Sequence, residues 1–208
     1  MLKFRKKTKI SSQRWLHRHF HDVYVKQARK EGYRSRAAYK LLEIQKKFCL
    51  LKSQQTIIDL GCAPGSWCQV VRDIVKKGAV IGVDLLVTEA MDGVKFIQGD
   101  FEDPCVQTDL KNSATFGIDG VLSDLAPTVT GHRSTDRIRT LRLLRSAFEF
   151  SREVLQPGGF FIAKNRVGSQ DDELFRAMRA CFTSVKFFKP QAVHKGSSEI
   201  YLVCQGRL

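Results

Sequence analysis

The stretch that most constrains the fold of this chain is residues 58–67, IDLGCAPGSW. Here an apolar run ends in an acid and a glycine-rich turn. Residues 56–58 are β-branched and predict a buried strand, whereas residues 67–75 repeat apolar side chains at helical spacing. Gly61 and Gly65 in the turn let the backbone approach a ligand closely, and the helix start offers free N–H groups. Together these elements predict a nucleotide-type cradle. The spacing is not G-x-G-x-x-G, which argues against a dinucleotide.

Acids follow each of the first three predicted strands. Asp59 ends the first, Asp84 follows an apolar run at 79–83, and Asp100 follows a run at 94–98. A carboxylate at the tip of the second strand can accept both hydroxyls of an adenosine ribose. A single acid of this kind could equally be the cap of a strand-to-helix turn. Three in register favour a carboxylate-lined adenosine pocket.

The rest of the chain continues the alternation of strands and helices. Asp124 ends a fourth strand, and the run at 160–164 ends on Lys164, a position that requires a carboxylate nearby. Further strands are predicted over 119–123, 160–164, 184–188 and 199–204, and helices over 136–155 and 171–182. The last two strands are too close for a crossover and should pair antiparallel. The pattern predicts five βα units and a hairpin: a Rossmann-like α/β sheet of seven strands, mostly parallel with a C-terminal antiparallel hairpin, and helices on both faces.

Positive charge is concentrated at the N-terminus. The chain has 35 Lys and Arg against 21 acids, a net charge of +14, and residues 1–40 hold 13 of the basic residues against Asp22 and Glu31. Interleaved aromatic side chains favour a nucleic acid partner over an ordinary solvated face or a targeting peptide. We therefore expect one domain over 1–208 with a basic RNA-binding extension at 1–45.

Two helices are expected within the basic extension. One should begin near Ser11 or Ser12, and the second should cover residues 33–44 with Ser35 as its cap. Lys40 lies inside the apolar pattern of this second helix. From this stretch alone, a solvated lysine at the helix edge is the commoner explanation.

Other features exclude several classes of protein. No apolar run approaches the roughly 18 residues of a membrane span. The six cysteines include no C-x-x-C pair, which favours reduced core residues of an intracellular protein over zinc ligands or disulfides. His17, His19 and His21 would diverge on a helix, so no metal site is predicted.

The motifs together resemble a known enzyme family. They are DLGCAPGSW at 59–67, SDLAP at 123–127, Lys164 after an apolar strand, and SSEIY at 197–201. This combination is similar to the FtsJ/RrmJ-type S-adenosylmethionine-dependent 2′-O-ribose RNA methyltransferases, and more narrowly to the ribosomal large-subunit RNA methyltransferase E group. The similarity covers nearly the whole chain. It includes all four members of the family's Lys-Asp-Lys-Glu tetrad, at Lys40, Asp124, Lys164 and Glu199.

The resemblance implies that S-adenosylmethionine is the cofactor and that the tetrad is catalytic without a metal. Lys164 would accept the proton, Asp124 would orient it, and Glu199 would order Lys40 or the substrate ribose. Asp84 would take the cofactor's ribose hydroxyls and Asp100 its adenine edge. The cofactor contacts implied are Gly61, Gly65, Trp67, Asp84, Asp100 and Asp124.

The implied substrate is a uridine ribose in the A-loop of 23S-type RNA in the large ribosomal subunit, with Arg34, Arg36 and Lys195 as RNA contacts. The chain departs from the family at two places. Asn165 and Arg166 follow Lys164 where relatives carry an aliphatic or aromatic pair. His194 stands where they usually carry Arg, so it is equally well explained as a phosphate contact or a plain loop residue.

Other functions are alternatives to this one. A 2′-O-methyltransferase of transfer RNA or capped RNA is the closest alternative, but 208 residues show no separate cap-binding module. A non-catalytic ribosome-assembly factor would not need the tetrad, and an oxidoreductase would not explain the basic arm. The expected setting is a monomer in a bacterial cytoplasm, favoured over a mitochondrial matrix, with no membrane partner.

Overall fold

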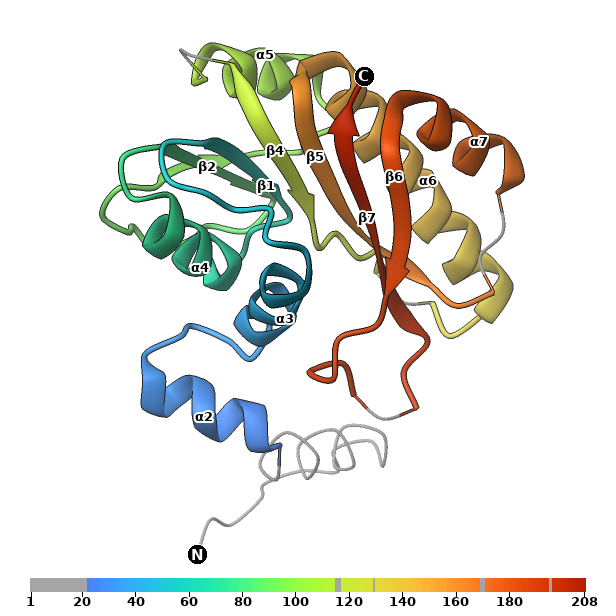
Figure 1. Ribbon diagram of the computed structural model, residues 1–208. Helices are drawn as coiled ribbons and strands as arrows, with labels where there is room; N and C mark the ends of the chain where they lie inside the picture. The colour runs from blue at the N-terminus through green and yellow to red at the C-terminus, as the bar shows by residue number, and fades with distance from the viewer. Residues whose placement is uncertain (1–21, 115–116, 129, 169–170, 195) are drawn as a thin grey trace, which may run out of the picture.

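The computed structural model describes residues 22–114, 117–128, 130–168, 171–194 and 196–208 (Figure 1). Seven strands form one sheet in the order β3-β2-β1-β4-β5-β7-β6. Their bounds are β1 Thr56–Leu60, β2 Ala79–Asp84, β3 Lys95–Gln98, β4 Ile118–Ser123, β5 Leu155–Arg166, β6 Phe182–Phe188 and β7 Glu199–Arg207. Strands β1 to β5 pair in parallel, and β7 pairs antiparallel with both β5 and β6. The predicted sheet and its antiparallel hairpin are thus confirmed.

Helices cover both faces of this sheet, as predicted. They are α2 Val23–Glu31, α3 Ala38–Phe48, α4 Ser66–Val75, α5 Pro104–Asn112, α6 Arg133–Val154 and α7 Asp172–Cys181. Helices α3 and α4 lie on one face, and α6 and α7 lie on the other (Figure 1). In the part of the chain that the structure describes, no helix has the length and apolarity to cross a membrane.

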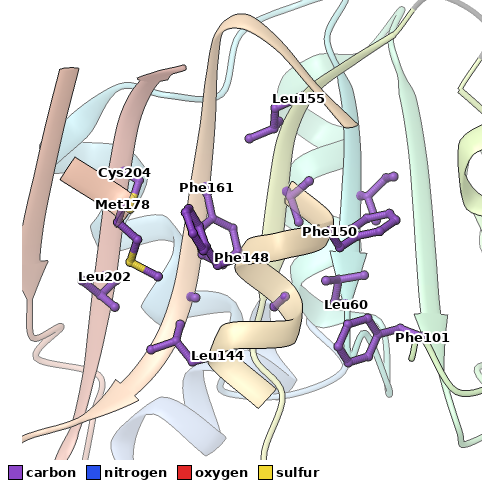
Figure 2. Packing of buried hydrophobic residues seen from close by; sticks show 14 of the residues in the cluster. Leu60, Phe101, Leu144, Phe148, Phe150, Leu155, Phe161, Met178, Leu202 and Cys204 are labelled. Carbon is purple, nitrogen blue, oxygen red and sulfur yellow. The ribbon is translucent and has the colours of Figure 1, made fainter. Parts of the chain in front are cut away.

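Alternation along the strands separates the core into two layers. Phe161 of β5 points toward α6, where its ring centroid lies 6.4 Å from that of Phe148 (Figure 2). Its neighbours Phe160 and Ile162 instead pack with the buried residues of α3 and α4. Because side chains alternate between faces, Lys164 must project on the α3 side of the sheet. The strand pattern therefore brings Lys164 to the same face as Lys40 of α3.

The connection between β2 and β3 differs from the prediction of five βα units. Residues 85–94 contain no helix, so helices follow only β1, β3, β4 and β5 among the described elements. A helical crossover needs about a dozen residues, more than this segment provides. Leu85, Leu86 and Val87 are exposed there instead, next to the end of β2.

The start of α3 also differs from the prediction. The helix begins at Ala38 rather than near Tyr33, and Ser35 is not its N-cap. The Ser35 hydroxyl instead accepts a hydrogen bond from the Ala37 N–H at 3.1 Å, within the turn before the helix. Leu41 and Ile44 of α3 are fully buried, so this end of the basic segment belongs to the core. The helix predicted from Ser11 or Ser12 lies outside the described residues.

Candidate active site

A cavity of about 620 Å³ opens at the carboxyl ends of the central strands. Gly61, Asp84, Asp100 and Asp124 all line it, so the structure brings together four of the six predicted cofactor residues. They come from separate segments: Asp84 is the last residue of β2, and the other three follow β1, β3 and β4. Parallel strands end at the same edge of a sheet, which explains why acids that are distant in sequence meet here.

The carboxylate of Asp84 is fixed in place but retains hydrogen-bonding capacity. Its Oδ2 accepts a hydrogen bond from the Ala63 N–H at 2.9 Å, and its Oδ1 accepts one from the Leu86 N–H at 2.9 Å. Each carboxylate oxygen has two lone pairs, so one on each remains for a ligand hydroxyl. Asp100 is exposed, and its Oδ1 accepts from the Glu102 N–H at 2.9 Å.

Two glycines are required by the turn after β1. Gly61 has a φ of +78°, and a Cβ there would lie 2.9 Å from Cδ2 of Leu125. Gly65 is the N-cap of α4 with a φ of +100°, and a Cβ there would lie 2.8 Å from Nη1 of Arg34. Only glycine accommodates these conformations and contacts without strain. Gly61 belongs to the cavity lining, whereas Gly65 packs against Arg34 just behind it.

Trp67 is placed differently from its prediction as a cofactor contact. Its side chain is buried in the layer between the sheet and α3, and its Nε1 donates to the Ala37 carbonyl at 2.8 Å. The indole has one donor, and that donor is already used. Trp67 therefore stabilises the start of α3 and does not line the cavity.

Asp59 is likewise not part of the pocket lining, which corrects the predicted set of three acids. It is completely buried, and its Oδ2 accepts a hydrogen bond from the Cys68 thiol at 3.3 Å. Its Oδ1 has no hydrogen-bond partner among the described residues. Burial and, to a smaller extent, the nearby charges of Asp124 and Asp84 raise the pKa of Asp59 to about 7, although the hydrogen bond from Cys68 acts in the opposite direction. Asp59 thus lies in the core, outside the cavity lining, and keeps its proton up to about neutral pH.

The raised pKa of Asp59 makes stability depend on pH. The folded protein holds this proton up to about pH 7, whereas the unfolded chain releases it near the ordinary value of 3.8. Wild-type stability should therefore fall as pH rises from 4 to 7, by roughly 4 kcal/mol at most. Asp59→Asn should remove this dependence. In urea unfolding, we expect the free energy of unfolding of Asp59→Asn to increase relative to wild type as pH rises. For Asp92→Asn, in an exposed loop, the difference from wild type in this free energy should not change with pH. A pH-independent difference for Asp59→Asn would contradict the assignment.

The four tetrad residues meet around Asp124, which also lines the cavity. Lys164 Nζ lies 2.9 Å from Oδ1 of Asp124 and donates to the Asp124 carbonyl at 2.6 Å. Lys40 Nζ lies 2.7 Å from Oε1 of Glu199 and 3.7 Å from Oδ2 of Asp124. Both lysine side chains are only 14% exposed. Lys40 is thus not the solvated lysine that its local sequence suggested.

Tyr201 is a member of this cluster that the sequence reasoning missed. Its hydroxyl lies 2.6 Å from Oδ1 of Asp124 and 3.0 Å from Oε1 of Glu199. Burial raises the pKa of Tyr201, and the two carboxylates raise it further, so the phenol remains a proton donor. The signal was available, because residues two apart on a strand share one face and Glu199 was already assigned.

The charge state of Asp124 is set by its partners. Burial alone would raise its pKa, but the ammonium groups of Lys164 and Lys40 and the Tyr201 hydroxyl together bring the pKa below its ordinary value. Asp124 is therefore ionised at neutral pH. It joins two cations and a phenol into one rigid arrangement beside the cavity.

Arg34 is engaged by the protein rather than free for RNA. Its Nη1 donates to the carbonyls of Pro64 at 3.0 Å and Glu89 at 2.8 Å, and its Nη2 donates to that of Ala90 at 2.9 Å. These bonds tie the glycine turn after β1 to the loop between β2 and β3. Arg34 is thus a clamp on two cavity loops, and its predicted role as an RNA contact is not supported.

Arg36 is also used within the fold. Its Nη1 lies 2.7 Å from Oδ2 of Asp22, the N-cap of α2, and the guanidinium contacts the Ala192 carbonyl and the His194 ring. His194 therefore packs in this cluster, with its Nδ1 3.4 Å from the same Asp22 oxygen. Neither the RNA role of Arg36 nor a phosphate role of His194 is supported by these contacts. Lys195, the third predicted RNA contact, lies outside the described residues.

The fold and the site define a class of enzyme. A Rossmann-like sheet with a carboxylate-lined cavity at its strand ends, next to a Lys-Asp-Lys-Glu cluster, is the arrangement of an S-adenosylmethionine-dependent methyltransferase. The chain belongs to the FtsJ-like methyltransferase family, whose sequence model matches residues 33–207. S-adenosylmethionine is the methyl donor of this family, so the cofactor predicted from the sequence is confirmed.

Relatives extend over nearly the whole chain. Ribosomal RNA large subunit methyltransferase E of Erythrobacter litoralis is 45% identical over 205 residues, covering 99% of this chain and 93% of its own. The enzyme of the same name from Rickettsia bellii is 44% identical over 212 residues, with the same coverage. A crystal structure of a Plasmodium falciparum protein, provisionally described as a ribosomal RNA methyltransferase, is 36% identical with a TM-score of 0.76. It covers 85% of this chain and 99% of its own.

Proposed function

We propose that this enzyme transfers a methyl group from S-adenosylmethionine to the 2′-hydroxyl of a uridine ribose in 23S-type RNA, within the A-loop of the large ribosomal subunit. The observation that carries the proposal is the pairing of Lys164, at 2.9 Å, with Asp124, which lines the cofactor cavity. The names of the relatives support ribosomal RNA as the substrate. We expect the enzyme to act as a monomer in the bacterial cytoplasm.

The residues of the cavity suit this cofactor. Asp84 has a free lone pair on each oxygen for the two ribose hydroxyls, and Asp100 lines the same cavity and is proposed to contact the adenine edge. The charges of Asp124 and Asp84 repel the ionised form of Asp59 and contribute to its raised pKa, which supports a site that favours cations. A ligand with a positive sulfonium and an ammonium group would relieve that repulsion. Gly61 keeps the backbone close enough to the cavity for contact.

The tetrad residues supply what the methyl acceptor needs. The bound cofactor supplies a methyl group that is already strongly electrophilic, so the protein must align the ribose oxygen and manage one proton. The carboxylate and the carbonyl oxygen of Asp124 both contact Nζ of Lys164. The third position on this nitrogen remains for the substrate hydroxyl. In this proposal Lys164 acts as a neutral amine: it first releases one ammonium proton to solvent, and the free lone pair on Nζ then receives the proton of the ribose 2′-hydroxyl. Glu199 orders Lys40, and Lys40 stabilises negative charge that develops on the ribose oxygen.

The alternatives differ in substrate rather than in chemistry. A transfer RNA or capped RNA would use the same tetrad, so the site does not distinguish it. The relatives favour the large ribosomal subunit, since they share nearly full length with this chain. A non-catalytic assembly factor is disfavoured, because it would have no need to hold two lysines and two acids in contact.

A direct assay tests the proposed function. Labelled S-adenosylmethionine is incubated with the enzyme and with large ribosomal subunits from cells that lack this methylation, with transfer RNA and capped RNA in parallel. The expected result is one 2′-O-methyluridine in the A-loop of the large-subunit RNA. Label on another RNA would overturn the substrate but keep the chemistry. No label on any RNA would favour the assembly-factor function.

The Arg34 clamp leads to a separate prediction. Lysine cannot reach three carbonyls at once, so Arg34→Lys should loosen both loops that shape the cavity. We expect the dissociation constant for S-adenosylmethionine to rise about tenfold, as lost charge-assisted hydrogen bonds imply. Isothermal titration calorimetry would measure it, and Arg29→Lys on the exposed face of α2 is the matched control. Unchanged cofactor affinity with weakened RNA binding would restore Arg34 as an RNA contact.

A further inference from the structure

A second hollow of about 540 Å³ lies beside the tetrad, next to the ends of β5 and β7. Arg137 and Arg166 contribute cationic side chains to its lining, and Ser197 and Ser198 contribute hydroxyls. None of these residues belongs to the cofactor cavity. Arg166 is one of the two positions where the chain departs from the pattern of the family. The lining is therefore suited to an anion.

Strand register fixes the position of Arg166 relative to the catalytic lysine. In the β5–β7 ladder Lys164 pairs with Tyr201, and Arg166 pairs with Glu199. Directly opposed residues project from the same face of a sheet, as do residues two apart on one strand. Arg166 thus occupies the next step beyond Lys164 on the catalytic face, about 7 Å further along the strand.

Arg166 differs from the arginines that the fold uses internally. Its Nε donates to the Ser198 hydroxyl at 3.2 Å, and among the described residues it forms no ion pair. Asp136 also lines the hollow, but its Oδ1 accepts hydrogen bonds from the Thr130 N–H and hydroxyl, both at 2.8 Å. Those bonds lower the pKa of Asp136, with a smaller contribution from the charge of Arg166. Within the described part of the chain, the remaining guanidinium donors of Arg166 have no carboxylate partner and can serve a ligand.

We propose that this hollow binds the 3′-phosphate of the target nucleotide, with Arg166 as its principal contact. In RNA, the 2′-hydroxyl and the 3′-phosphate are carried by adjacent carbons of one ribose. A hydroxyl held at Lys164 therefore brings its own phosphate to the next position on the same face, which Arg166 occupies. Ser197, Ser198 and Arg137 complete the site. The phosphate contact fixes the rotation of the ribose, so the 2′-oxygen rather than another oxygen faces the tetrad.

This inference rests on the proposed function and is tested by the kinetics of Arg166→Gln on unmethylated large ribosomal subunits. We expect KM for the subunit to rise roughly tenfold, as loss of one charge-assisted contact implies. The slope of log kcat/KM against log salt should become shallower by about one unit. The cofactor dissociation constant and the melting temperature should stay unchanged. Arg166→Lys should recover part of the loss.

The matched control is Arg179→Gln, which removes the same charge from the exposed surface of α7. If Arg166→Gln and Arg179→Gln show the same KM and salt slope, the phosphate site is wrong. A fall in kcat alone, with KM unchanged, would also overturn it. Failure of the proposed function is distinguishable, because wild-type enzyme would then not methylate the subunits at all.

Discussion

Replacing Lys164 with alanine is expected to abolish methyl transfer while leaving the affinity for S-adenosylmethionine within a few-fold of wild type. Lys164 contacts Asp124 through both its carboxylate and its carbonyl, and it is not in the lining of the cofactor cavity. Removal of the side chain takes away the proposed proton acceptor. Loss of a proton-transfer group costs on the order of 10² to 10⁴ in kcat. Single-turnover methylation of subunits and calorimetric titration of the cofactor measure the two effects separately.

Lys186→Ala, on the exposed side of edge strand β6, removes a lysine outside the cluster and serves as the control for Lys164→Ala. It should leave both turnover and cofactor affinity unchanged. If Lys164→Ala lost turnover and cofactor binding together, Lys164 would be a structural residue that holds Asp124 in place. Turnover near the wild-type rate would exclude Lys164 as the proton acceptor.

Asp124→Asn should reduce both catalysis and stability. The carboxylate is the only acid that contacts both lysines of the tetrad within the described structure, and Tyr201 donates to it as well. Without its charge, two partly buried ammonium groups lie close together with one remaining acid, Glu199. Removing one partner of a buried ion pair in this way lowers the free energy of unfolding by about 3 kcal/mol. We expect kcat to fall at least 100-fold, because Lys164 loses its orientation.

The stability effect of Asp124→Asn should depend on pH in a defined direction. The pKa of Asp124 is lowered in the folded protein, so its ionised form stabilises the fold above the ordinary value of 3.8. This contribution is lost as pH falls through the folded pKa. Urea unfolding should therefore show a large difference between wild type and variant at pH 7 that shrinks below pH 4. Asp109→Asn, an exposed change on α5, should show no such trend. A difference that persists at low pH would indicate lost packing instead.

Much of the fold could be read from the sequence because it depends on local periodicity. The β-branched run before Asp59, the runs before Asp84 and Lys164, and the helical spacing after Gly65 each predict one element. Parallel strands then bring their ends together without further information. This is why Asp84, Asp100 and Asp124, assigned from sequence, do line one cavity. The tetrad was likewise assigned from motifs, and its members are in contact.

Only the tertiary structure decided how the side chains next to these motifs are used. Arg34 and Arg36 carry the charge of RNA-binding residues, yet their partners at Glu89, Ala90 and Ala192 are more than 50 residues away in sequence. Asp59 and Asp84 lie near the ends of neighbouring strands, but Asp59 is buried in the core and Asp84 lines the cavity.

Composition and periodicity specify which residues are charged and which elements form. They do not specify which distant backbone carbonyl satisfies a given guanidinium, because that pairing exists only once the loops have packed. The sequence by itself therefore determined the sheet and the cofactor edge, and its resemblance to the family identified the four tetrad residues. The tertiary structure decided that Trp67, Arg34 and Arg36 are bonded within the fold, and that Tyr201 and Arg166 lie on the same face of the sheet as Lys164.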